Sequence, residues 1–474
     1  MNVQKKNTFP KTPTGISGLD EITKGGFPKG RPILICGSAG CGKTLLAMQF
    51  LVKGITDYNE PGVFMSFEES AGDLAQNVLS LGFDLDKLKT EKKLRIDHVR
   101  IERSEIEETG EYDLEGIFIR LNHAIDSIGA KRVVLDTIES LFAGMSNDTL
   151  LRAEIRRLFE WLKGKGVTTI ITGERGENSL TRQGLEEYVS DCVVLLDFRV
   201  IDQIATRRLR IVKYRGSTHG TNEYPFLIDE NGISVMPVTS LKLDYKSPGD
   251  IISTGLPALD NLFTAGGIYR GSSTLITGTA GTSKTILAAH FAMSSCRRKE
   301  KVLYFSFEES PDQLARNMAT IGINLQSQIR AKLLLVHASR PSLQGLEMHL
   351  LVLNKLMTEF EPKTVIIDPI SSLITIGSSS EVRAMLVRLM DTLKINQVNA
   401  LFTSLTQLNS SNSNDATVDA VSSLADNWIN VKNEDSKGNR VRSLLIVKAR
   451  GMGHYNDCQH FIITNKGIRF LTQN

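Results

Sequence analysis

Short runs of apolar residues alternate with segments of helical periodicity along the first half of the chain. Runs of strand length occupy residues 32–36, 63–67, 133–136 and 167–171. Apolar residues at helical spacing occupy 114–128 and 151–162, and residues 45–52 are rich in helix formers. Strands that alternate with helices predict an α/β fold, with a mainly parallel sheet and helices on both faces.

The second half of the chain repeats segments of the first half in the same order. Ser66–Ser70 recurs unchanged at 306–310, an offset of 306 − 66 = 240, and Lys213–His219 matches Lys448–His454 at 448 − 213 = 235. A nearly constant offset predicts a duplicated domain. The polar stretch Pro237–Asp250 marks the boundary, and we predict domains over residues 1–246 and 247–474.

Length and composition narrow the class of protein. The 474 residues exceed what one core holds, and the net charge of 56 − 53 = +3 provides no basic field for nucleic acid. The N-terminus lacks a signal-peptide pattern, and no apolar run is long enough to span a membrane. The five cysteines form no C-x-x-C pair, so neither zinc nor disulfides are expected. We expect a cytoplasmic protein.

The segment Gly37–Thr44 fits G-x-x-x-x-G-K-[ST], the P-loop that cradles nucleotide phosphates, and lies between a predicted strand and a predicted helix. Its backbone N–H groups and the helix N-terminus would face anionic oxygens. Lys43 would reach the β- and γ-phosphates, and the Thr44 hydroxyl would ligate Mg²⁺. Cys41 is expected to fill the loop rather than to act as a redox centre. The predicted phosphate-binding residues are Gly37, Ser38, Gly40, Cys41, Gly42, Lys43 and Thr44.

A second P-loop, Gly278–Thr285, follows 241 residues after the first (278 − 37 = 241). Ser283 replaces the glycine before the lysine, where glycine lets the backbone approach phosphate without a Cβ. We expect the serine to slow turnover or shift the geometry while binding persists. The corresponding binding residues are Gly278, Thr279, Gly281, Thr282, Ser283, Lys284 and Thr285, with Thr285 also a Mg²⁺ ligand.

Acidic residues follow two of the predicted strands in each half. Glu68-Glu69 and Glu308-Glu309 are candidate catalytic carboxylates, because one member of such a pair can serve as a base while the other tunes it. The alternative is a solvated helix start, and the identical recurrence favours catalysis. Asp136 and Asp368 end buried strands as Walker B aspartates do and would hold Mg²⁺; the alternative is a carboxylate that begins a turn.

Two cations follow an apolar-alternating strand in each half, Lys213 and Arg215 in the first and Lys448 and Arg450 in the second. They are either a charged strand end or a pair that reaches the γ-phosphate on a neighbouring copy, as an arginine finger in trans.

Together, the P-loops, the Ser-Phe-Glu-Glu-Ser elements, the Walker B aspartates and the K-x-R-G-x-x-H elements resemble the RecA superfamily. The tandem arrangement, with Thr14-Gly15-Ile16 ahead of the first loop and Glu223–Phe226 closing the first copy, resembles the KaiC family of circadian-clock ATPases and autokinases from about Lys11 to Phe470. The resemblance implies two tandem RecA-like domains in a double-ring homohexamer, with ATP and Mg²⁺ between subunits. It also implies that Lys213, Arg215, Lys448 and Arg450 act on a neighbour's nucleotide, and it adds Arg383 as a γ-phosphate-facing arginine.

The resemblance further implies that the first ring is mainly an ATPase, with a KaiB-like partner, and that the second phosphorylates itself. The phosphorylated pair falls on Ser422 and Ser423, with Thr417 as a regulatory threonine. At the offset of 235, the serines align with Glu187-Tyr188, so the first half lacks the hydroxyl pair. A serine pair in a loop or helix cap is the alternative. Glu308 would be the base that accepts the hydroxyl proton.

The chain ends four residues after Phe470 (474 − 470 = 4), whereas clock members of the family continue into a long tail that KaiA binds. KaiA-style stimulation is therefore not expected. The polar run 409–415 has the composition of a surface loop; the alternative places it near a neighbour's nucleotide.

Two other functions share these motifs. A RecA- or DnaB-like nucleic-acid-dependent ATPase has the same core, but the near-neutral charge and the lack of a basic stripe with interleaved aromatics argue against it. A passive scaffold held together by ATP would not need the Glu pairs. The sequence therefore favours an ATPase and serine/threonine autokinase in timing or stress signalling.

Overall fold

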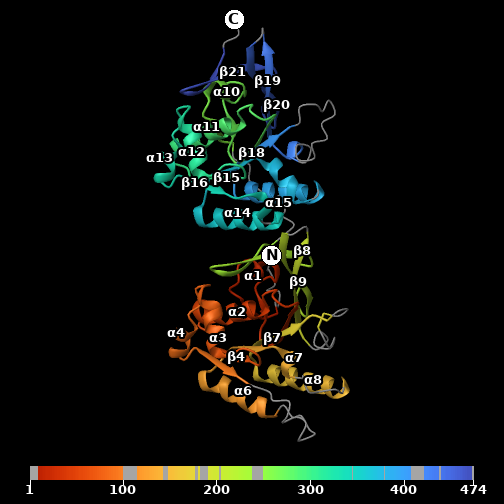
Figure 1. Ribbon diagram of the computed structural model, residues 1–474. Coiled ribbons are helices and arrows are strands. Elements are labelled where there is room, and N and C mark those ends of the chain that lie inside the picture. Colours follow the sequence, from red (N-terminus) through yellow and green to blue (C-terminus); the bar gives the residue numbers. More distant parts are fainter. Residues whose placement is uncertain are drawn as a thin grey trace, which may run out of the picture. The chain divides into compact units, whose positions relative to one another are not determined.

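The chain folds into two compact units, Met1–Thr239 and Ser240–Asn474. The computed structural model describes residues 9–99, 115–141, 148–176, 180–181, 190–201, 204–237, 249–343, 345–377, 379–406, 421–436 and 439–471. Each unit is built around its own sheet and is described by itself (Figure 1).

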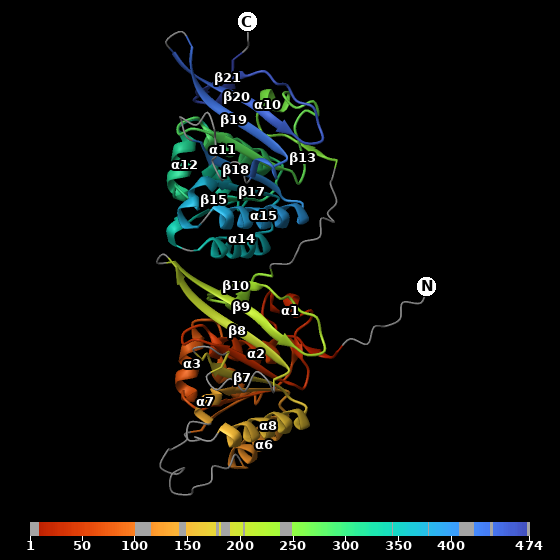
Figure 2. The same ribbon diagram turned by 90° about the vertical axis from the view of Figure 1, so that its right-hand side faces the viewer.

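The first unit contains a nine-stranded sheet within the described residues, in the order β11-β10-β9-β8-β3-β7-β6-β4-β5. The strands from β5 to β8 run parallel, and β9, β10 and β11 extend the sheet in antiparallel pairs. Figure 2 shows β8, β9 and β10 side by side. The strands of this unit are β1 (Lys11–Thr12), β2 (Phe27–Pro28), β3 (Pro32–Gly37), β4 (Gly62–Ser66), β5 (Leu94–His98), β6 (Arg132–Asp136), β7 (Thr168–Glu174), β8 (Cys192–Ile201), β9 (Ile204–Tyr214), β10 (Glu223–Asp229) and β11 (Gly232–Val235).

Helices cover both faces of this sheet. Residues of α2, α3 and α4 form one buried cluster with the strands, and residues of α6 and α8 form another with the opposite side chains of β4, β6 and β7. The helices are α1 (Leu19–Ile22), α2 (Lys43–Tyr58), α3 (Ala71–Leu79), α4 (Leu85–Thr90), α6 (Glu115–Ile128), α7 (Ile138–Leu141) and α8 (Asp148–Lys165). The central strands are apolar on both faces because both are covered, as the uninterrupted apolar runs predicted.

The second unit has the same architecture, with the sheet order β16-β15-β17-β18-β14-β19-β20-β21-β22 among the described residues. Its strands are β12 (Ile251–Ile252), β13 (Ile268–Tyr269), β14 (Ser273–Gly278), β15 (Val302–Ser306), β16 (Leu334–Ala338), β17 (Thr364–Asp368), β18 (Asn399–Leu405), β19 (Asn427–Ser436), β20 (Asn439–Ala449), β21 (Gln459–Thr464) and β22 (Gly467–Phe470). Its helices are α10 (Pro257–Asp260), α11 (Lys284–Arg297), α12 (Pro311–Ala319), α13 (Leu325–Arg330), η1 (Pro341–Leu343), α14 (Leu346–Phe360), η2 (Ile370–Ile376) and α15 (Ser379–Ile395). The predicted tandem pair of mainly parallel α/β domains is confirmed.

A buried arginine begins β6 in the first unit and has no counterpart in the second. Arg132 is 0% exposed and donates to Glu60 Oε2 at 2.7 Å and to the carbonyl of Phe50 at 2.8 Å. Burial lowers the pKa of Arg132, and the contact with Glu60 opposes that shift. At the offset of 232, Thr364 takes this place in β17 and hydrogen-bonds Ser295, so the two sheets are tied to their P-loop helices by different chemistry.

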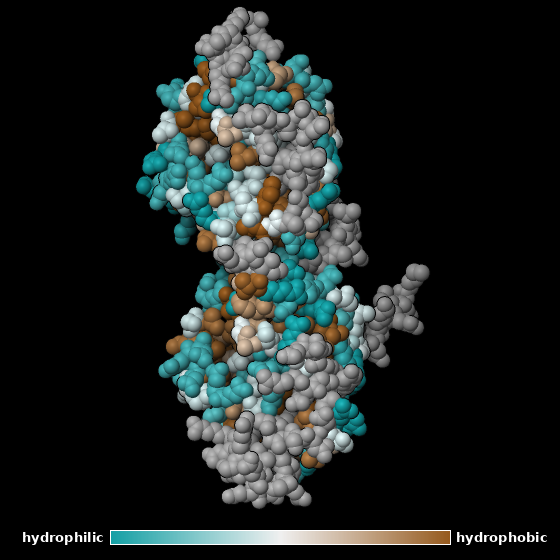
Figure 3. All heavy atoms as spheres, turned by 45° about the vertical axis from the view of Figure 1, so that its right-hand side comes forward, coloured by the Kyte–Doolittle hydropathy of each residue, from teal (hydrophilic) through white to brown (hydrophobic). Residues whose placement is uncertain are grey.

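The hydropathy of the surface is visible on one face of the molecule (Figure 3). Figure 3 shows hydrophilic residues over much of one face, with hydrophobic residues in small groups. Among the described residues, no helix is long and apolar enough to cross a membrane.

The two P-loops share one backbone conformation but differ in the residue that adopts it. Gly42 has φ +105°, and Ser283 has φ +81° at the same position before the lysine. This left-handed region costs a residue with a Cβ about 1–2 kcal/mol. The Ser283 hydroxyl is also buried without a hydrogen-bond partner among the described residues. The second loop is therefore strained where the first is relaxed.

We expect Ser283→Gly to stabilise the second unit by about 1 kcal/mol, because it removes the left-handed strain. Gly42→Ser should destabilise the first unit by at least as much, since an added Cβ would lie 3.2 Å from Ile228 Cδ1. Each unit holds one of the two tryptophans, Trp161 in α8 and Trp428 in β19, so urea unfolding followed by fluorescence can be assigned by Trp→Phe variants. An unchanged or lower midpoint for Ser283→Gly would contradict the prediction.

Candidate nucleotide-binding sites

In each unit, the motif residues meet at the carboxyl edge of the parallel strands. Ser66 pairs with Asp136 across β4 and β6, and Ser306 pairs with Asp368 across β15 and β17. The P-loop that follows β3 or β14 opens onto the same edge. Ligands of open α/β sheets bind at this edge, so the register alone brings the loop, the Glu pair and the Walker B aspartate together.

The P-loop lysines lie against the loop itself. Lys43 Nζ donates to the carbonyls of Gly37 at 3.0 Å and Ser38 at 3.1 Å, and Lys284 Nζ donates to Gly278 and Thr279, both at 2.8 Å. Both lysines are buried. Burial lowers the pKa of Lys284 to about 8, and the charges of Asp368 and Glu308 oppose this shift. Both ammonium groups are thus held where the motif requires a cation for phosphate.

The Walker B aspartate of the first unit is joined to the P-loop helix. The carboxylate of Asp136 accepts a hydrogen bond from Thr44 Oγ1 at 2.8 Å and another from Thr172 of β7. Burial raises the pKa of Asp136, and these two hydroxyls oppose the shift. A threonine hydroxyl beside a carboxylate supplies the oxygen ligands that Mg²⁺ takes in nucleotide sites, so this pair fits the metal.

The second unit holds its aspartate through the equivalent strand threonine, since Thr403 occupies the register position of Thr172, and through one different hydroxyl. Asp368 accepts from the buried Tyr304 hydroxyl at 2.6 Å and from Thr403 of β18. Burial raises the pKa of Tyr304 far above its usual value, and the charge of Asp368 adds to the shift. Tyr304 therefore remains a donor. Thr285 and Asp368 line one pocket, so the predicted ligand pair is together here as well.

The two members of each Glu pair point to different partners. Glu68 Oε1 accepts from Thr137 and Ser140, each at 2.8 Å, whereas Glu69 Oε2 accepts from Asn77 of α3 at 2.9 Å. In the second unit, Glu308 lines the pocket, and Glu309 Oε1 accepts from Asn317 of α12 at 2.9 Å.

The turn that separates the two glutamates is fixed by the first serine of the motif. Ser66 Oγ donates to the carbonyl of Glu69 at 2.7 Å and accepts from its N–H at 3.1 Å, and Ser306 makes the same two bonds with Glu309. The last serine of the motif, Ser70 or Ser310, caps the next helix. The motif therefore includes the helix start that was the alternative interpretation, and it directs only the first glutamate to the site.

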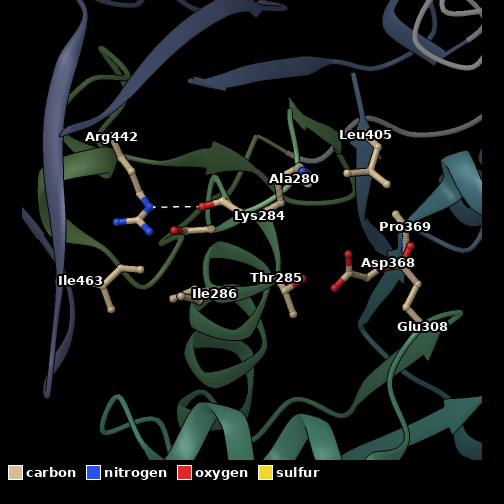
Figure 4. A pocket seen from close by; sticks show the side chains of 12 residues that line it. Ala280, Lys284, Thr285, Ile286, Glu308, Asp368, Pro369, Leu405, Arg442 and Ile463 are labelled. Carbon is tan, nitrogen blue, oxygen red and sulfur yellow. Dashed lines mark hydrogen bonds between the residues drawn. The ribbon is translucent and has the colours of Figure 1, made fainter. Parts of the chain in front are cut away.

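The pocket of the second unit has a volume of about 390 Å³, within the range of ligand sites. In Figure 4, Glu308, Asp368 and Pro369 lie on one side of the P-loop, and Arg442 and Ile463 lie on the other. Arg442 of β20 donates through Nε to the Gly281 carbonyl at 3.4 Å. No sequence motif marks Arg442, because the antiparallel strands that bring it over the loop carry none.

The paired cations lie beside the predicted phosphorylation segment. Lys448 Nζ donates to the carbonyls of Ser422 at 2.8 Å and Ser423 at 3.3 Å, and Arg450 donates to the Ser423 carbonyl at 2.6 Å. Arg450 also lies 3.8 Å from Asp426. The residues that line the pocket of this unit do not include the two cations or the two serines, all of which are within the described part of the chain.

In the first unit, Arg215 lies 3.5 Å from Asp191 and Lys213 is on β9. Arg383 is on α15, after the Walker B strand as expected. Thr417, Glu187-Tyr188 and the polar run 409–415 lie outside the described residues.

Comparisons with known proteins identify the family. The model of the family "ATPase: KaiC" matches twice, at residues 12–240 and 252–474. The chain is 54% identical to the circadian clock protein KaiC2 of Synechocystis, over 97% of this chain and 81% of the relative. It is 36% identical to the circadian clock oscillator protein KaiC of Thermostichus vulcanus, over 98% of this chain and 89% of the relative. For KaiC of Synechococcus elongatus the values are 35%, 98% and 90%.

Both matches cover a P-loop, a Glu pair and a Walker B aspartate in the geometry described above. The chain therefore belongs to the KaiC family of ATPases, with two KaiC/RecA-like P-loop domains in tandem.

Proposed function

We propose that the first unit hydrolyses ATP and that the second transfers a phosphoryl group to Ser422 and Ser423 of a neighbouring copy. The observation that carries the proposal is the position of the Ser422–Ser423 backbone. It is held by Lys448 and Arg450, and none of these residues lines the pocket in its own unit among the described residues. Both the cations and the serines thus suit the nucleotide of an adjacent subunit.

In the first unit, a water oxygen attacks the γ-phosphorus, the bond to the β,γ-bridging oxygen breaks, and Glu68 accepts the proton of the water. Lys43 offsets the charge on the phosphates. Mg²⁺, held by Thr44 and Asp136, would neutralise further phosphate charge. The geometry supports Glu68 as the base, since Glu69 is turned toward Asn77.

In the second unit, the acceptor is a seryl oxygen instead of water. Glu308 takes the hydroxyl proton, and Lys284 occupies the place of Lys43, with Thr285 and Asp368 suited to Mg²⁺. The first half lacks a matching hydroxyl pair, so the transfer is assigned to the second unit alone. If every copy places its serines at the nucleotide of the next copy, the copies must form a closed ring. The family resemblance suggests that this ring is a homohexamer.

The names of the relatives place them in the circadian clock. We therefore propose a timing or stress-signalling role in the cytoplasm for this chain, with a KaiB-like protein as partner of the first unit. A nucleic-acid-dependent ATPase is not favoured, because no basic stripe with interleaved aromatics accompanies the P-loops.

Glu68→Gln should lower steady-state ADP release by the first unit about 10²–10⁴-fold, because it removes the base. Glu69→Gln should lower it by less than about tenfold, since a glutamine oxygen can still accept from Asn77. Both variants are measured in a Glu308→Gln background, so that ADP reports on the first unit. Equal losses for the two variants would show that the pair acts as a unit and would contradict the assignment.

After incubation with Mg-ATP and no added protein, phosphopeptide mapping should find phosphate on Ser422 and Ser423. Glu308→Gln should remove it, and Glu309→Gln serves as the matched control that retains it. Absence of phosphate on both serines, or its persistence in Glu308→Gln, would contradict the proposal.

Mixing two inactive variants tests transfer between copies. Glu308→Gln supplies serines without a base, and the double variant Ser422→Ala, Ser423→Ala supplies a base without acceptors. Phosphate should appear on Ser422 or Ser423 of the Glu308→Gln copies only in the mixture, once subunits have exchanged. The control is wild-type protein, which must phosphorylate itself and exchange subunits under the same conditions. If that control succeeds and the mixture of variants still carries no phosphate, the transfer occurs within one chain.

A further inference from the structure

The two candidate base carboxylates differ in how they are held. Glu68 Oε1 accepts from Thr137 Oγ1 and from Ser140 Oγ, each at 2.8 Å, which is an ordinary distance for such a bond. Glu308 Oε1 accepts only from Ser372 among the described residues, at 3.4 Å, beyond the usual 2.5–3.0 Å of such bonds. One carboxylate is therefore fixed by two donors, and the other is held weakly by one.

A single substitution between the repeats removes one of the two donors. Residues 136–141 align with residues 368–373 at the offset of 232, so Ser140 corresponds to Ser372 and Thr137 corresponds to Pro369. Proline has no hydroxyl, and its ring lines the pocket beside Glu308 (Figure 4). The second unit thus lacks one of the two donors, and the other, Ser372, lies farther from its glutamate.

The segments that carry these residues are otherwise anchored alike. In the first unit, Glu139 Oε1 accepts from the N–H of Glu174 at 2.6 Å, and in the second, Ser371 Oγ accepts from the N–H of Leu405 at 3.1 Å. Each bond joins the turn after the Walker B strand to the end of the next strand, β7 or β18. The difference at the base is therefore local to the hydroxyls.

We propose that Thr137 and Ser140 are positioning residues that hold Glu68 for attack by water, and that Pro369 leaves Glu308 able to turn toward a seryl hydroxyl from another copy. This inference rests on the proposed function. Water is small and must be oriented in line with the bond that breaks, so a fixed base favours hydrolysis. A seryl oxygen arrives where its own chain places it, so the base must adapt to it. The residue after the Walker B aspartate then selects the acceptor.

The first test removes one hydroxyl without changing side-chain shape. In the full-length Glu308→Gln protein, Thr137→Val should lower kcat for ADP release about tenfold with KM unchanged, because the base is misplaced while binding persists. Thr137→Ser, which keeps the hydroxyl, should retain kcat within about threefold. Thr56→Val, which removes a hydroxyl from α2 that bonds the Val52 carbonyl, is the matched control and should change neither constant.

The inference is overturned if Thr137→Val keeps wild-type kcat, or if Thr137→Ser loses as much as Thr137→Val. If Thr137→Val does not fold, Ser140→Ala decides, since Ser140 is partly exposed in the short helix α7. Wild-type kcat in that variant overturns the inference. Glu68→Gln in the same background separates the two levels. Full ATPase activity of the Glu68→Gln variant contradicts the proposed function. Loss of ATPase activity in Glu68→Gln, together with full activity in Thr137→Val, contradicts only this inference.

The reciprocal variant, Pro369→Thr, should return a donor to Glu308. In a Glu68→Gln background, it should raise the ratio of ADP released to phosphate on Ser422 and Ser423 at least about threefold, because water then competes better with the serines. An unchanged ratio in protein that still binds ATP would overturn the selection by Pro369.

Discussion

The hydrogen bond between Thr44 and Asp136 joins the two parts of the first site, and the rest of that site depends on it. Thr44 begins the P-loop helix, and Asp136 ends the strand beside the one that carries the Glu pair. Burial raises the pKa of this carboxylate, and the hydrogen bonds from Thr44 and Thr172 oppose that shift. In the second unit, Tyr304 and Thr403 donate hydrogen bonds to Asp368. The same edge of the sheet is thus assembled twice, with an equivalent threonine donor from the next strand and a different second donor.

These differences are consistent with two sites that diverged after duplication. The first has a relaxed P-loop with Gly42, an aspartate bonded to its P-loop threonine, and a base held by two hydroxyls. The second has Ser283 in a left-handed conformation and a base beside Pro369. Each change loosens or strains the second site relative to the first. Strain of this kind persists where the surrounding structure fixes it, often at functional sites.

Much of the fold followed from the sequence because it depends on local patterns. The apolar runs gave the central strands to within a few residues, and the repeat gave the second unit from the first. The P-loops, Glu pairs and aspartates meet as expected because parallel strands end at one edge. The sequence could not show that Glu69 turns away to Asn77, since adjacent carboxylates look equivalent until the Ser66 turn is known. Arg442 and Tyr304 were also missed, because side chains from distant strands reach the site only through the tertiary register.

The central claim is that both units use ATP, but that the first hydrolyses it and the second transfers its γ-phosphoryl group to serine. The most direct measurement incubates full-length Lys43→Ala and Lys284→Ala proteins with γ-labelled ATP and measures free phosphate and phosphate on Ser422 and Ser423 separately. Each variant must first show the same oligomeric mass in solution as the wild-type protein. The account predicts that Lys43→Ala loses most free phosphate but keeps labelled serines, and that Lys284→Ala loses the labelled serines but keeps free phosphate. Loss of both products in the same single variant, with the other variant active in both, would contradict it.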